Sequence, residues 1–179
     1  MNEFGTTATG RAWLRLAEPL TVSRPDPQLP RARSLARNDR VGDLRTAPGE
    51  VGAVVDDGGP RRVELTFPTW DDEARAAATG VLAAAGDDEV VAALTAAGAP
   101  PVPDAGSVEG SCDCGRRGRC RHVIAVLIEL ARRVDEAPEL GPQLRGLGVR
   151  RAGADDPSRV RIADLDPHAF WTAGVGGTP

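Results

Sequence analysis

An α+β fold is predicted by three features of the sequence. Three short runs that favour β-strands lie between residues 40 and 67 and are separated by turn-forming residues. Two segments with helical periodicity follow between residues 69 and 98. The third feature is a cluster of cysteines and a histidine at 112–122, directly before the most regular amphipathic pattern of the chain. We therefore expect a small three-stranded antiparallel meander, two helices, and a compact cysteine-containing unit that ends in a long helix.

The composition fits a packed core with loosely ordered ends. Hydrophobic residues make up 41% of the 179 residues, which is enough for a core, whereas the 15 prolines and 21 glycines gather at both ends and near residues 98–110. From these shifts we predict four parts: an N-terminal arm, partly extended, over 1–35, a β-meander plus helices over 36–105, a finger-like unit over 106–147, and a C-terminal tail with a docking cluster over 148–179.

The charge restricts the choice of partners. The formal net charge is −4, and every basic side chain other than histidine is arginine. Because affinity for nucleic acid comes largely from neutralising phosphates, this balance argues against a protein that simply coats DNA or RNA, although it leaves room for a local basic patch. No apolar run approaches the ~18 residues of a membrane span, and no basic segment precedes an apolar core at the N-terminus, so we expect a soluble cytoplasmic protein without membrane contact. In that reducing compartment, clustered cysteines favour a metal over disulfides.

The N-terminal arm carries one short apolar patch, Ala12–Leu16, which Pro19 interrupts. Three prolines between residues 25 and 30 then favour an extended chain. A lone tryptophan rarely stays fully hydrated, so we expect Trp13 to dock on the main domain.

The meander is expected to use Arg40–Leu44, Val51–Val55 and Arg62–Phe67 as its strands. The third run alternates apolar and polar residues, so one of its faces packs inward. The segments Pro48–Glu50 and Asp56–Pro60 between the runs are typical of hairpin turns.

Two helices are predicted next. Thr69 can cap the first, Ala74–Ala85, with three acidic residues in the first turn, where the helix dipole favours negative charge. Asp87 can cap a shorter helix, Asp88–Ala97, that ends at Gly98.

The strongest helical pattern follows His122. Its apolar positions recur at spacings of four, three and four residues, at Val123, Leu127, Leu130 and Val134. Pro138 closes this helix, the segment Leu140–Leu147 is expected to fold back, and Asp166–Trp171 is expected to dock as a C-terminal clasp.

The cysteine cluster has the spacing of a metal site. It contains two close pairs of ligands, which are Cys112 with Cys114 and Cys120 with His122. Two side chains one residue apart on an extended stretch point the same way, and glycines between the pairs allow the chain to turn back. Four such ligands match the tetrahedral coordination of Zn²⁺ and leave no open position, so we predict one structural zinc ion.

Other interpretations explain less of the cluster. A redox dithiol of Cys112 and Cys114 leaves the second pair without a role. A thiol nucleophile with His122 as its base lacks an obvious oxyanion hole or orienting carboxylate in the sequence. Unrelated core cysteines would not be expected in two pairs within eleven residues. We interpret His168 as a surface or packing histidine, and the acidic pairs at 71–72, 87–88 and 155–156 as helix starts and loops.

The order Cys-x-Cys, a gap, then Cys-x-His resembles the SWIM zinc finger, whose ligand positions fall here on Cys112, Cys114, Cys120 and His122. The helix entry Cys120–Leu127 is similar to the family's run of cysteine, basic residue, histidine and apolar residues. Similarity to small bacterial SWIM finger proteins of actinobacterial type covers Arg31–Val41 and Asp166–Trp171, so we expect the resemblance to span about residues 31–171.

The resemblance implies a zinc-clipped ββα-like finger with a long C-terminal helix. It also implies a structural zinc and a binding role towards DNA or protein, often beside SNF2-type helicases, without catalytic activity of its own. The gap Gly115–Arg119 is short and lacks the aromatic residue and the proline that many bacterial members carry. We therefore expect no aromatic contact from this gap.

Four arginines lie on and beside this gap, namely Arg116, Arg117, Arg119 and Arg121. Arginine side chains suit phosphates and guanine edges, so we regard the four as a candidate nucleic-acid site. They equally fit a solvated loop that balances the net −1 charge of Zn²⁺ bound by three thiolates. Two functions follow: a zinc-binding adaptor that contacts DNA and/or a SNF2-type helicase, or a protein–protein interaction module with a structural zinc and no nucleic-acid binding. Nothing in the sequence supports an enzyme or a small-molecule substrate.

Overall fold

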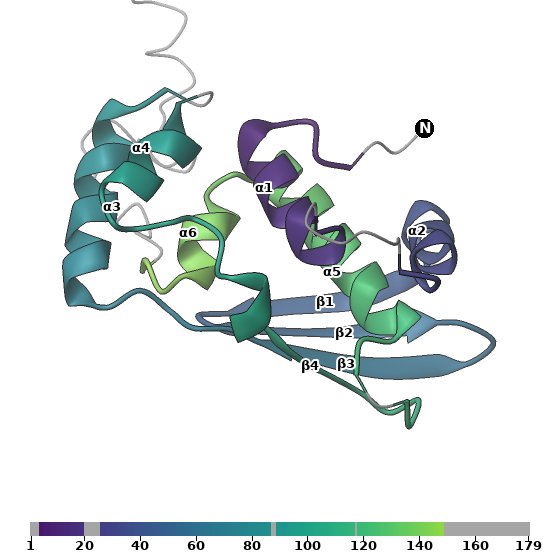
Figure 1. Cartoon of the computed structure of the whole chain (residues 1–179). Coiled ribbons are helices and arrows are strands. Elements are labelled where there is room, and N and C mark those ends of the chain that lie inside the picture. Colours follow the sequence, from purple (N-terminus) through teal and green to yellow (C-terminus); the bar gives the residue numbers. More distant parts are fainter. Residues whose placement is uncertain (1–3, 20–25, 87–88, 117, 149–179) are drawn as a thin grey trace, which may run out of the picture. The chain divides into compact units, whose positions relative to one another are not determined.

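The computed structural model of the chain describes residues 4–19, 26–86, 89–116 and 118–148 (Figure 1). The clasp predicted at Asp166–Trp171, together with His168, Arg117 and the acidic residues 87–88 and 155–156, lies outside these ranges. In chain order, the elements are α1 (Ala8–Ala17), α2 (Leu29–Arg37), β1 (Val41–Ala47), β2 (Glu50–Asp56), β3 (Pro60–Thr66), α3 (Asp72–Ala84), α4 (Val90–Ala96), the 3₁₀ turn η1 (Ala105–Ser107), β4 (Glu109–Cys112), α5 (Arg121–Glu136) and α6 (Leu140–Leu144).

The strands form one antiparallel sheet in the order β1-β2-β3-β4. The α+β class and the meander of the first three strands are therefore confirmed. The predicted number of strands was wrong, because β4 adds a fourth strand along β3, with Cys112 opposite Val63. The sequence of β4, Glu-Gly-Ser-Cys, has neither β-branched residues nor alternation, so the hydrogen bonds that the edge of β3 offers decide its conformation. Among the described residues, β4, which leads into the cysteine cluster, thus pairs with β3 of the meander.

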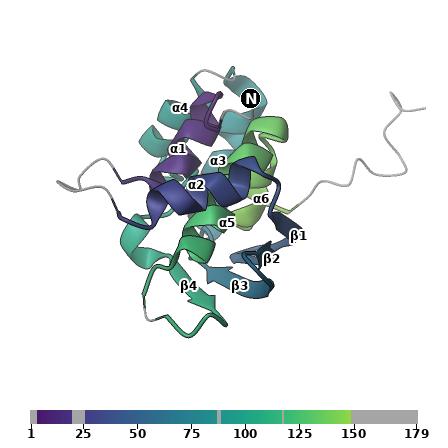
Figure 2. The ribbon, with the colours of Figure 1, turned by 90° about the vertical axis from the view of Figure 1, so that its right-hand side faces the viewer.

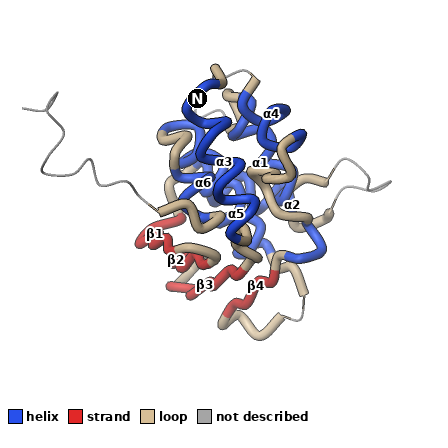
Figure 3. The backbone as a smooth tube through the Cα atoms, turned by 90° about the vertical axis from the view of Figure 1, so that its left-hand side faces the viewer, coloured by secondary structure: helices blue, strands red, loops and turns tan. Residues whose placement is uncertain are grey.

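Helix α5 is the centre of the fold. Every residue from His122 to Ala131 is buried, and α1, α2 and the sheet all pack against this helix (Figures 1 and 2). The helices lie on one side of the sheet, as Figure 3 shows, where Val51, Val63 and Leu65 are buried. A helix buried on nearly all sides belongs to a core. Nevertheless, neither α5 nor any other helix in the described ranges is long and apolar enough to cross a bilayer.

The described part of the N-terminal segment contains two helices, α1 and α2. Residues 1–3 and 20–25 lie outside the described ranges, so the partly extended arm over 1–35 stays a prediction. Thr7 caps α1, with its side-chain oxygen accepting a hydrogen bond from the N–H of Gly10, and α2 begins at Leu29. Pro30 lies in the first turn of α2, where the N–H that proline lacks would have no helical partner anyway. Pro30 therefore marks a helix start, which the sequence pattern alone does not distinguish from an extended chain.

Trp13 joins the main core, which confirms its expected docking. Its side chain is 1% exposed and meets Phe67 edge-on, with ring centroids 5.7 Å apart. This contact connects α1 to the segment that follows β3.

A second, smaller core lies between α3 and α4 and contains Trp70, Ala78, Leu94 and Ala99. Both predicted helices are present, and Gly98 ends α4 with a positive φ of 77°. The cap of α3 differs from the prediction, because the carboxylate of Asp71, not the hydroxyl of Thr69, accepts from the N–H of Ala74 at 2.8 Å. Asp71 competes well for this role because its carboxylate is charged and suits the helix dipole.

The start of α1 is held by a carboxylate near the far end of α5. Asp135 accepts hydrogen bonds of 2.7–3.1 Å from the backbone N–H groups of Gly5, Thr6 and Thr7 and from the Thr7 hydroxyl. Burial on its own would raise the pKa of Asp135, but these hydrogen bonds outweigh it and hold the pKa below its ordinary value of 3.8. The anchor of the first helix thus lies about 130 residues away along the chain.

We expect Asp135→Ala to destabilise the protein by about 1–3 kcal/mol, because four donors lose their acceptor. A carboxyl group whose pKa is lowered by folding stabilises the native state above its unfolded pKa, and this contribution is lost as the pH falls through the folded pKa. Urea unfolding at pH 7 and pH 3 measures the effect, and the penalty should shrink at pH 3. Glu136→Ala, which removes an exposed neighbour, is the control. An equal penalty at both pH values would contradict this account.

Candidate metal centre

The two pairs of candidate ligands come from the end of a strand and the start of a helix. Cys112 is the last residue of β4, and Cys114 follows two residues later in the turn. Cys120 is the N-cap residue of α5, and His122 lies in the first turn of that helix. The second pair is therefore fixed by the helix that forms the centre of the core.

The chain between the pairs turns back on itself. Gly115 and Gly118 have φ angles of 72° and 77°, a region that favours glycine. The first turn is tied to the sheet through Asp113, whose N–H donates to the carbonyl of Arg62 at 3.2 Å. In return, the carboxylate of Asp113 accepts from the N–H of Arg62 at 3.1 Å. These bonds place the first pair of thiols at the edge of the sheet, facing the start of α5.

The four side chains converge with distances that fit a tetrahedral ion. One ligand atom from each of the four residues lies within 4.8 Å of every other, and Nδ1 of His122 is 3.5 Å from Sγ of Cys112 and 3.8 Å from Sγ of Cys120. Zinc bonds of about 2.3 Å to sulfur and about 2.0 Å to nitrogen place tetrahedral ligand atoms roughly 3.5–3.8 Å apart. The chain therefore positions Cys112, Cys114, Cys120 and His122 to bind one zinc ion.

The two thiols of the first pair differ in acidity. Burial is the main reason that the pKa of Cys112 is raised. A hydrogen bond from the backbone of Arg116 is the main reason that the pKa of Cys114 is lowered, to about 7. Cys114 is thus the thiol that ionises most readily of the two. Binding of a zinc ion requires thiolates, and it would release the remaining thiol protons.

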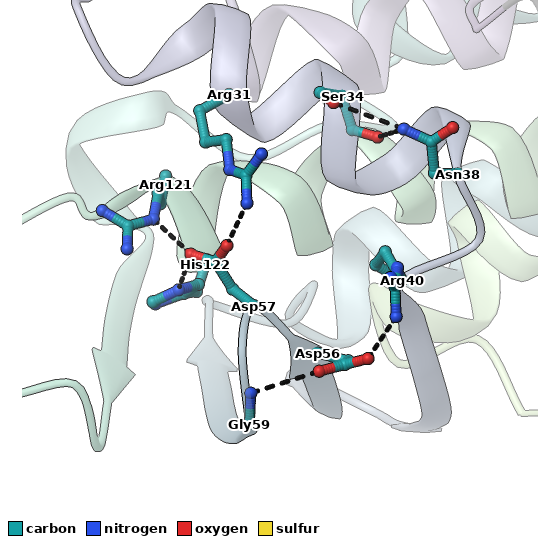
Figure 4. Close-up of polar contacts among 9 residues, drawn as sticks. All are labelled: Arg31, Ser34, Asn38, Arg40, Asp56, Asp57, Gly59, Arg121 and His122. Atoms are coloured by element: carbon teal, nitrogen blue, oxygen red, sulfur yellow. Dashed lines mark hydrogen bonds and ion pairs between the residues drawn. The ribbon is translucent and has the colours of Figure 1, made fainter.

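The far side of the imidazole ring faces a carboxylate that the sequence did not reveal. Nε2 of His122 lies 3.1 Å from Oδ2 of Asp57, in the turn between β2 and β3 (Figure 4). The sequence predicts that turn correctly but assigns its aspartates no further role. Metal-bound histidines commonly donate their second ring N–H to a carboxylate, so the expectation of a zinc-bound histidine was the one available signal. That expectation alone does not identify which of the many acidic residues of the chain accepts this hydrogen bond.

Two arginines hold the carboxylate of Asp57 from other directions. Nη2 of Arg31, on α2, and Nε of Arg121, at the start of α5, each lie 2.5 Å from one of its oxygens (Figure 4). The side chain of Asp57 is only 5% exposed. The hydrogen bonds from Arg31, Arg121 and His122 keep the pKa of Asp57 well below its ordinary value, against the opposing effect of burial.

A carboxylate behind His122 would also suit a thiol nucleophile with a histidine base, which the sequence disfavoured for lack of such a group. The surroundings of the other ring nitrogen decide against that interpretation. Nδ1 of His122 faces two cysteines at similar distances, and the third cysteine completes a group of four donors. A nucleophile needs one thiol and an open approach, whereas a closed tetrahedral site uses all four side chains.

Two of the four loop arginines contact other parts of the chain. Arg121 pairs with Asp57, and the guanidinium of Arg119 donates to the carbonyls of Leu16 and Ala17 at the end of α1. Arg116 is exposed, and Arg117 lies outside the described residues. Two members of the candidate nucleic-acid site therefore have partners within the chain.

Comparison with known protein families identifies the same segment. Residues 90–131 match the SWIM zinc finger, and this segment contains α4, β4, most of α5 and the loop Gly115–Arg119 between the ligand pairs, here called the ligand loop. The resemblance stated from the ligand spacing is thereby confirmed for these residues. No curated protein and no solved structure shows significant similarity to the chain. The wider resemblance, over about residues 31–171, stays a prediction.

Proposed function

Because residues 90–131 are a SWIM zinc finger, we propose that the chain is a non-catalytic, zinc-binding adaptor that docks on a larger protein. A SNF2-type helicase is the class of partner that the resemblance implies, and the reducing cytoplasm is the compartment that suits three unbridged cysteines. The closed set of four ligands supports a structural role for the metal, because no coordination position is left for a substrate.

The pairing of the arginines favours a protein partner over DNA. Near the finger, Arg31 and Arg121 contact Asp57, and Arg40 contacts Asp56. These carboxylates offset the positive charge of the arginines, and the chain as a whole carries a net charge of −4. Affinity for DNA depends on cations that are free to neutralise phosphates, so the arrangement offers little of it.

The outer face of the sheet is a surface on which a protein could dock. Glu50, Glu64 and Thr66 are exposed there, and Val54 is half-buried. Within the described part of the chain, the helices lie on the opposite face (Figure 3). A face that mixes charged and apolar groups fits the polar rim and apolar centre of a protein interface. The outer edge of β1 also offers backbone groups for strand addition.

A DNA contact is the second candidate, and one observation favours it. Arg116 is exposed in the ligand loop, next to Arg117 in the sequence. The two could reach a phosphate backbone while the finger docks on a DNA-bound helicase. Such a contact would add to the protein interface without replacing it.

We expect the zinc-loaded chain to bind a purified SNF2-type helicase of its host equally well before and after nuclease treatment, as measured by surface plasmon resonance. Binding to labelled duplex DNA, measured by fluorescence anisotropy, should be weak. If only Arg116 and Arg117 contact phosphates, affinity should fall about 10-fold between 50 and 200 mM salt, whereas contacts by four arginines would give about 150-fold.

The double variant Arg116→Ala/Arg117→Ala should remove most of the DNA affinity and leave helicase binding unchanged. Arg37→Ala is the matched control, because it removes an exposed arginine at the end of α2, outside the loop between the ligand pairs and outside the sheet. Helicase binding that disappears with nuclease would refute protein docking. A salt dependence near 150-fold would instead establish the four-arginine nucleic-acid site.

A further inference from the structure

Asp57 is not one of the four candidate ligands, but its side chain contacts one of them and two arginines. This residue lies outside the segment 90–131 that matches the zinc finger, yet its buried carboxylate touches the ligand His122. It also receives Arg31 from α2 and Arg121 from the start of α5. Figure 4 shows these three side chains converging on the turn between β2 and β3.

The two nitrogens of the His122 ring face different groups. Nδ1 points to the sulfur atoms of Cys112 and Cys120, at 3.5 and 3.8 Å, and Nε2 points to Oδ2 of Asp57, at 3.1 Å. A neutral imidazole carries one N–H, and its other nitrogen offers a lone pair to a metal. Since an ionised carboxylate only accepts hydrogen bonds, the contact with Asp57 requires the proton on Nε2.

We propose that Asp57 is the positioning residue of the zinc site. Its carboxylate accepts the Nε2–H of His122, which selects the tautomer with a free lone pair on Nδ1 and fixes the ring towards the three thiols. Arg31 and Arg121 hold the carboxylate in this orientation. They also offset its negative charge next to a site whose three thiolates already exceed the charge of Zn²⁺.

This assignment makes the metal site depend on segments far apart in the sequence. Arg31 belongs to α2, Asp57 follows β2, and the ligands begin at Cys112. The finger therefore needs the meander and α2 for its full affinity. The inference concerns the metal site alone and holds whichever macromolecule the chain binds.

The test uses zinc itself as the probe and the full-length chain. We expect Asp57→Asn and Asp57→Ala to weaken zinc affinity by about 10- to 100-fold, measured by competition with a chromogenic chelator. Asp56→Asn is the matched control, because Asp56 precedes Asp57 at the end of β2, pairs with Arg40, and forms no hydrogen bond or ion pair with His122. Unchanged affinity in Asp57→Asn would overturn the proposal.

A double-mutant cycle separates positioning from a general effect on folding. In a His122→Cys background, the fourth ligand is a thiolate with no ring to orient, so Asp57→Asn should then cost little affinity. An equal loss in both backgrounds would give Asp57 a merely structural role and overturn the proposal.

The wild-type protein provides a readout that needs no variant. In the zinc-loaded chain, ¹H–¹⁵N correlation spectra of the His122 ring should show a protonated Nε2 and a metal-bound Nδ1. A metal-bound Nε2 would overturn the proposal even if the Asp57 variants failed to fold.

Discussion

Cys120→Ser is expected to lower the melting temperature of the whole region 4–148 by about 10 °C or more, and not only that of the finger. Cys120 is 1% exposed and belongs to the same core cluster as α1, the sheet and α5. Structural zinc contributes about 10–16 kcal/mol to the folding of isolated zinc fingers. Loss of even about 4 kcal/mol would shift the transition by roughly 8–16 °C in a chain of this size.

The measurement is thermal unfolding followed by circular dichroism, with and without a strong chelator. The chelator should lower the transition of the wild type to near that of the variant and leave the variant unchanged. Ser111→Ala, an exposed position in β4 next to Cys112, should melt like the wild type in both conditions. A metal-free wild type with unchanged melting would rule out a structural zinc.

The same experiment separates the metal site from a redox dithiol. A dithiol of Cys112 and Cys114 needs no contribution from Cys120, so its reactivity towards an oxidant would survive Cys120→Ser, and a chelator would not affect it. The structure places all three sulfur atoms around one histidine nitrogen, which is the reason to expect the metal-dependent outcome.

The parts of the fold that could be predicted are those whose signals are local. The ligands lie within eleven residues, so their spacing identifies them without knowledge of the fold. The long helix follows from the apolar pattern after His122, and the hairpins follow from turn residues at Pro48–Glu50 and Asp56–Pro60. In each case the residues that decide the structure are neighbours in the chain.

The parts that were missed depend on distant partners. The strand β4 forms because the edge of β3 accepts it, although its own residues do not favour a strand. Helix α1 begins where Asp135 receives its first N–H groups, about 130 residues away. The role of Asp57 likewise appears only when α2, the sheet and α5 come together. A sequence read in short windows contains none of these contacts.

Trp13→Ala is the second large effect that we expect, with a loss of about 3–5 kcal/mol in stability. The indole is 1% exposed and meets Phe67 edge-on. Its Nε1 also packs closely on Gly141, where a Cβ atom would come within 3.0 Å of it. Removing a large aromatic side chain from such a site costs its burial and leaves a cavity. A Trp13 side chain exposed to solvent would predict almost no effect, so urea unfolding of this one variant tests whether α1 packs on the core through its indole.

Two further variants show what part of the indole matters. Arg15→Ala changes an exposed position on α1 and should stay within about 0.5 kcal/mol of the wild type. Trp13→Phe should cost much less than Trp13→Ala, for a specific reason. The Nε1 of Trp13 is buried and has no hydrogen-bond partner among the described residues, so phenylalanine removes an unsatisfied donor while keeping most of the apolar area. If Trp13→Phe and Trp13→Ala cost the same, the indole N–H must have a partner, and the packing of α1 on the core would need to be revised at that contact.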